Sequence, residues 1–90
     1  MTTRKLKIVE VTWHDIAGHG PGWMSATDLE EATHIVCRTV GYLWSKGKDS
    51  IKVVSTFTND GDASDLNVIP VGVVVSIRDL GVVSVATNEE

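Results

Sequence analysis

The chain has 90 residues, of which 42% are hydrophobic and 22% are charged, and its formal net charge is −4. This length and composition predict one folded domain spanning 1–90. The acidic balance argues against non-specific binding to DNA or RNA, which relies on clustered lysine and arginine. A lone cysteine, Cys37, allows no intrachain disulfide, and no apolar run is long enough to cross a membrane, so we expect a cytoplasmic protein.

The first predicted element is a strand over Lys5–Trp13, in which Val9, Val11 and Trp13 alternate onto one face. A long glycine-rich loop follows and continues through Gly22. Within 24–32, the spacing Thr27-x-x-Glu30 fits a helical capping box. It favours a short helical turn, although a structured loop would also satisfy it.

The rest of the chain reads as strands separated by turns. Gly41 in mid-strand predicts a bulge or sharp bend. Proline cannot donate to a ladder, so Pro70 ends a strand and favours a helical turn over Ile69–Val73. The polar end, about 87–90, is expected to be a flexible tail. The predicted strands are His34–Ser45, Ile51–Thr58, Leu66–Ile69, Val73–Asp79 and a sixth over Gly81–Ala86.

Five or six short strands without a long helix predict a mostly β protein. A proline break between the last two core strands and a long loop after the first strand fit a strongly bent, SH3-like (Sm-like) barrel. A Greek-key OB barrel is the alternative.

The segment Trp13–Trp23 is the candidate working surface, because two tryptophans bracket a glycine-rich loop there. The tryptophans would stack on a flat ligand, which contributes roughly 1–3 kcal/mol per ring. They could equally be core residues or subunit contacts. Backbone amides of the loop would face an anion, and an arginine or histidine would supply charge. The candidate ligand-binding residues are Trp13, Asp15, His19, Gly20, Gly22, Trp23 and Arg38.

The glycine spacing does not match a dinucleotide fingerprint, because Pro21 stands inside it and no long helix follows. His14, Asp15, His19, His34 and Cys37 are metal-ligand types, but His34 and Cys37 would lie on opposite faces of a strand. No acid, base or nucleophile set has a recognisable spacing. We therefore expect no metal, no cofactor and no enzymatic activity.

Several scattered motifs resemble a group of short phage and prophage accessory proteins of uncharacterised function. The motifs are Trp13-x-Asp15, Gly22-Trp23, Thr39-Val40-Gly41-Tyr42-Leu43 and Ile69-Pro70-x-Gly72-x-Val74-x-x-Ile77-x-x-Leu80. The resemblance implies a protein made in an infected bacterium that acts by binding. It would be a homo-oligomer that captures a small nucleotide-like ligand, as a sponge for an immune signal, or binds a host protein. The alternatives are a virion assembly protein and an Sm-like RNA-binding module.

Overall fold

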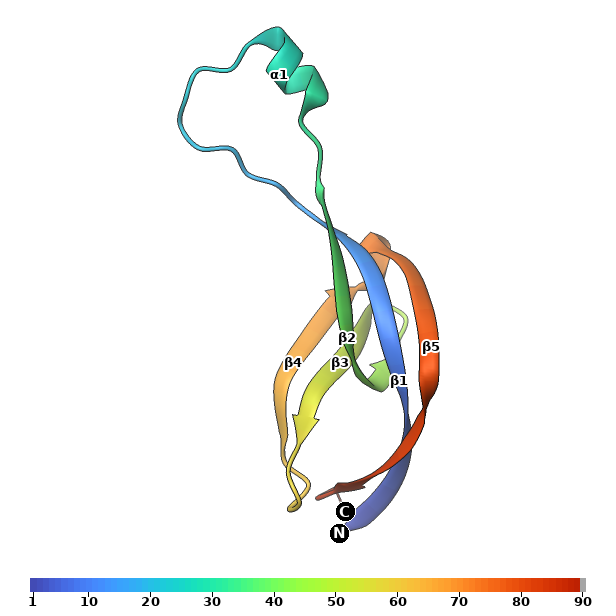
Figure 1. Cartoon of the computed structure of the whole chain (residues 1–90). Helices are drawn as coiled ribbons and strands as arrows, with labels where there is room; N and C mark the ends of the chain where they lie inside the picture. Colours follow the sequence, from blue (N-terminus) through green and yellow to red (C-terminus); the bar gives the residue numbers. More distant parts are fainter. Residues whose placement is uncertain (90) are drawn as a thin grey trace.

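The computed structural model describes residues 1–89, which form one antiparallel sheet with the strand order β4-β3-β2-β1-β5 (Figure 1). The prediction of a mostly β protein is confirmed. β4 and β5 are the two edges, and no ladder joins them among the described residues, so the sheet is not closed as a barrel. The strands are β1 (Thr2–Asp15), β2 (Ile35–Lys46), β3 (Ser50–Phe57), β4 (Ala63–Pro70) and β5 (Val74–Thr87).

The molecule is elongated, 58 × 23 × 21 Å, because the β1–β2 hairpin runs on beyond the sheet (Figure 1). The β5 ladder on β1 ends at the pair Trp13–Val74, and the β3 ladder on β2 begins only at Tyr42–Val54. Past those points β1 and β2 pair only with each other, as far as Asp15–Ile35. We call residues 15–34, which form the far end of this projection, the arm.

The core is a cluster of five fully buried aliphatic side chains: Val9, Val11, Ile51, Val53 and Ile69. Burying such side chains contributes about 1.5–3 kcal/mol each. The half-buried residues Trp13, Leu43, Val73, Val74 and Ile77 pack around them. All of these residues come from the five strands and from the short 3-10 helix η1 (Val71–Val73). The arm contributes nothing to the core.

Gly41 is required by a close approach between β2 and β3 and not by a bulge. A Cβ atom there would lie 2.7 Å from the carbonyl oxygen of Val54 and 2.9 Å from Cγ1 of Val53. The bulge predicted at Gly41 lies instead between Leu43 and Ser45, where the β2–β3 register shifts. The helical turn predicted around Pro70 is confirmed as η1.

The predicted sixth strand is wrong, because Gly81–Ala86 continues β5. A bulge at Leu80 joins the two halves, since Ile8 pairs with Gly81 and Val9 with Asp79. Gly81 adopts φ 130°, which disfavours other residues. Its N–H donates to Oδ1 of Asp79 at 2.9 Å, and this bond, aided by nearby Lys7, holds the pKa of the Asp79 carboxyl below its ordinary value of 3.8.

The helix predicted after the first strand is confirmed, but its cap lies two residues earlier. α1 (Ala26–Glu31) begins after Ser25, whose hydroxyl accepts from the Asp28 N–H, while the Asp28 carboxylate accepts from the Ser25 N–H. Ser25-x-x-Asp28 and Thr27-x-x-Glu30 both fit a capping box, so the sequence pattern could not distinguish them. No residue of α1 is buried, and none of the described helices is long and apolar enough to cross a membrane.

Candidate functional site

Trp13 lies at the root of the arm and packs on the body of the protein. It is half-buried against the core, and its indole Nε1 donates to Oγ1 of Thr39 at 2.9 Å. Its neighbour across the ladder is Cys37, a half-buried free cysteine. Both the ring and the N–H of Trp13 are therefore engaged within the fold.

Trp23 is placed quite differently, at the end of the connection that precedes α1. The residue is fully exposed, and a shallow concavity there is lined by Pro21, Gly22 and Trp23. The Gly22 N–H donates to the Gly20 carbonyl at 2.9 Å and forms a tight turn around Pro21. The structure therefore does not bring Trp13 and Trp23 together around one pocket.

The other candidate residues are spread along the arm and its root. Asp15 ends β1 and accepts from the Ile16 N–H at 2.9 Å. Arg38 lies exposed on β2, opposite Thr12. His19 lines an open concavity of about 420 Å³, together with Ile16, Ala17, Ala32, Thr33 and His34. Arg38 is not among these lining residues.

Two histidines meet where the arm leaves the sheet. The ring centres of His14 and His34 are 3.9 Å apart, with the planes inclined by 38°. Within residues 1–89 no three histidine, cysteine or carboxylate side chains gather as a metal site would require. This contact joins the end of β1 to the residue before β2, at the base of the arm.

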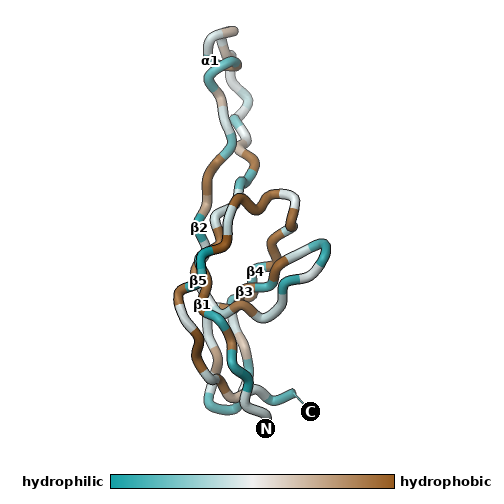
Figure 2. The backbone as a smooth tube through the Cα atoms, turned by 90° about the vertical axis from the view of Figure 1, so that its right-hand side faces the viewer, coloured by the Kyte–Doolittle hydropathy of each residue, from teal (hydrophilic) through white to brown (hydrophobic). Residues whose placement is uncertain are grey.

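The arm displays apolar side chains that nothing in the described chain covers. Ile16 is 87% exposed and Leu29 is 63% exposed, besides the fully exposed Trp23. Ile35 and Val36 at the root are half exposed. Figure 2, coloured by hydropathy, shows apolar segments on both of the backbone segments that lead out to α1. These exposed apolar side chains make the arm a candidate contact surface.

A third cavity, which the sequence pattern did not indicate, lies at the opposite end of the molecule. It measures about 350 Å³, and Trp44, Phe57 and Leu66 from three strands form much of its apolar wall. The lining also includes Lys52, Val54, Gly61, Asp62, Ala63, Thr87, Asn88 and Glu89. These residues are far apart in the chain, so only the folded sheet assembles them.

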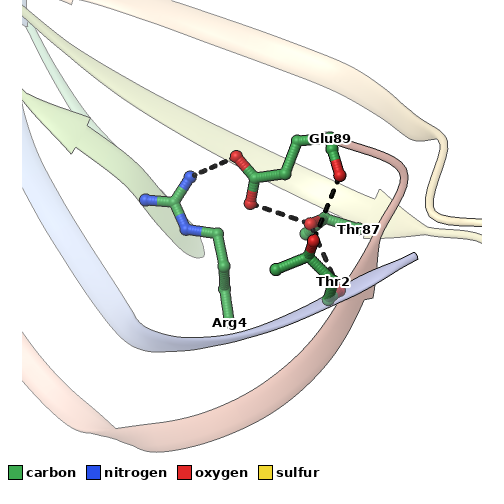
Figure 3. Close-up of polar contacts among 4 residues, drawn as sticks. All are labelled: Thr2, Arg4, Thr87 and Glu89. Carbon is green, nitrogen blue, oxygen red and sulfur yellow. Dashed lines mark hydrogen bonds and ion pairs between the residues drawn. The ribbon is translucent and has the colours of Figure 1, made fainter.

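A polar network holds one side of this cavity in place (Figure 3). The Thr2 hydroxyl donates to the Glu89 carbonyl at 3.1 Å, and the Thr87 hydroxyl donates to Oε1 of Glu89 at 2.8 Å. Arg4 pairs with Oε2 of Glu89 at 3.4 Å. The end predicted to be a flexible tail thus includes a buried Thr87 that completes β5 and a bonded Glu89, while residue 90 lies outside the described residues.

No family model, curated protein or solved structure matches the chain. Only the geometry of these sites therefore bears on their function.

Proposed function

We propose that this protein is a non-enzymatic binding protein that forms homo-oligomers, with the arm as its contact element. The observation that carries the proposal is the fully exposed Trp23, held away from the sheet on a projection that adds nothing to the core. Large apolar side chains in such positions are typical of contact sites, and tryptophan is one of the residue types enriched among the residues that contribute most to binding.

Charge favours a second copy of the chain as the partner. The arm carries four carboxylates, Asp15, Asp28, Glu30 and Glu31, and all eight lysine and arginine residues lie outside it. An acidic, apolar arm fits a surface that is basic and apolar.

The β1–β5 ladder offers such a surface. Exposed Lys5 and Lys7 on β1 lie opposite Ser84 and Val82 on β5, and Lys7 also pairs with Asp79 at 3.5 Å. Val82 is 58% exposed and Leu80 is 45% exposed. β5 is also a long edge strand, whose unpaired backbone groups favour association with another chain. We propose that the arm of one copy docks on these residues of the next.

The finer fold and the biological setting belong to the same proposal. The strand order, the long connection after β1 and the 3-10 turn between β4 and β5 support an SH3-like arrangement that is open in the described chain. The motifs set out above support a phage accessory protein acting in a bacterial cytoplasm. A virion assembly role fits the same contact surface.

Sedimentation of the wild type and of Trp23→Ala tests the proposal. We expect an oligomer for the wild type and about thirtyfold weaker self-association for the variant, because truncating a central interface tryptophan costs about 2 kcal/mol. The circular dichroism spectrum and the melting temperature should not change, since Trp23 packs on nothing.

Charge reversal identifies the acceptor surface. Lys5→Glu with Lys7→Glu should weaken the oligomer, and the matched control, Lys46→Glu with Lys48→Glu near the β2–β3 turn, should not. A wild type that stays monomeric at every concentration tested would refute self-association. Equal effects of the two double variants would refute this docking surface.

A further inference from the structure

The cavity at the end opposite the arm is lined by aromatic side chains that suit a planar ring. Trp44 and Phe57 lie with ring centres 6.1 Å apart and planes inclined by 40°, and Tyr42 supports Phe57 edge-on at 5.2 Å. The Arg4 guanidinium stacks 4.1 Å from the centre of the Trp44 ring and is not among the lining residues. It therefore orients the indole without filling the cavity.

The register of the sheet places the remaining apolar walls beside these rings. Val54 pairs with Tyr42 on one side and with Leu66 on the other. On the far side, the β3–β4 turn closes against the end of β5, where a Cβ on Gly61 would collide with the backbone of Thr87 and Asn88. The cavity of about 350 Å³ lies within the range of small-molecule sites.

Both carboxylates that line the cavity accept hydrogen bonds, whereas its one lysine has no ion-pair partner among the described residues. Asp62 accepts from Nδ2 of Asn88 at 2.6 Å, and Glu89 is engaged by Arg4 and Thr87. Lys52 also lines the cavity, and it belongs to none of the three ion pairs found within residues 1–89. A lysine ammonium binds anions such as carboxylate and phosphate, so Lys52 is the lining group suited to an anionic ligand.

We propose that this cavity binds a small planar aromatic anion. Its ring would lie against Trp44 and Phe57, and its carboxylate or phosphate would bind Lys52. Nucleotides and aromatic carboxylates share this chemistry. The inference is independent of the proposed role of the arm, because the two surfaces share no residue.

Calorimetric titration with adenosine monophosphate and with indole-3-acetate tests this site and distinguishes nucleotides from aromatic carboxylates as its ligands. We expect saturable binding of at least one of them. Adenosine and inorganic phosphate should bind much more weakly, because adenosine lacks the anionic group and inorganic phosphate lacks the aromatic ring. Lys52→Met should weaken binding roughly tenfold or more, because it removes a charge-assisted hydrogen bond.

Matched variants separate the site from general effects. Lys48→Met removes a lysine outside the cavity and should bind normally, whereas Phe57→Leu, with its fold checked by circular dichroism, should bind weakly. Trp23→Ala should leave binding unchanged, which distinguishes this site from the arm. Absence of binding by both anions, or equal binding by the wild type and Lys52→Met, would overturn the inference.

Discussion

Trp13 and Trp23 bracket one segment but have opposite environments. Trp13 donates a hydrogen bond to Thr39 and packs on the core, whereas Trp23 is fully exposed. Alternation along β1 predicts the inward position of Trp13, because Val9, Val11 and Trp13 share a face. Nothing local predicts the exposure of Trp23, which depends on how far the arm projects. The stacking of Arg4 on Trp44 joins residues far apart in the chain, so it could be found only in the folded structure.

Substituting Gly41 tests the close approach of β2 and β3. We expect Gly41→Ala to lower the free energy of unfolding by about 1–3 kcal/mol, because its Cβ would press on the backbone of Val54 and on Val53. Urea unfolding measures the loss. Gly72→Ala is the matched control, since a Cβ there meets nothing within 4 Å. Equal stabilities for the two variants would contradict the observed packing.

The arm is the element whose removal should leave the sheet intact. Asp15 and Ile35 are the last ladder partners, so Asn-Gly in place of residues 16–34 would join them by a two-residue hairpin turn. We expect a stability equal to that of the wild type or up to about 2 kcal/mol higher, because a shorter loop costs less closure entropy.

Thermal unfolding and sedimentation of this shortened chain measure the two consequences separately. The proposed homo-oligomer should be lost while the cooperative unfolding transition remains. An unfolded product would show that the arm is part of the folding unit. A folded product that still forms the wild-type oligomer would show that the contact lies elsewhere.

At the level of elements, regular alternation of side chains was sufficient to predict most strands. It could not predict that β5 continues through Leu80, because a bulge with φ 130° at Gly81 resembles a turn in the sequence. Closure of the sheet also lies outside what alternation can predict. It depends on whether β4 and β5 approach each other across the whole width of the sheet.

Across the whole molecule, acidic and basic groups are unevenly distributed. The arm has carboxylates but no lysine or arginine, and the exposed Lys5 and Lys7 lie on the sheet. If opposite charges guide docking, self-association should weaken by several fold between about 0.05 M and about 1 M salt, because screening shortens the range of charge interactions. Sedimentation at both salt concentrations measures this. An oligomer that tightens with salt would point to a purely apolar contact.

The hydrogen bond from Thr2 to Glu89 has a consequence for the path of the backbone. The two ends of the described chain meet at the pole farthest from the arm, and Thr2 also pairs with Thr87 in the sheet (Figure 1). A short linker could therefore join the ends, and new termini could open between Gly18 and Gly20 without removing a ladder pair. We expect a chain permuted in this way to form the same sheet with a different order of strands along the sequence.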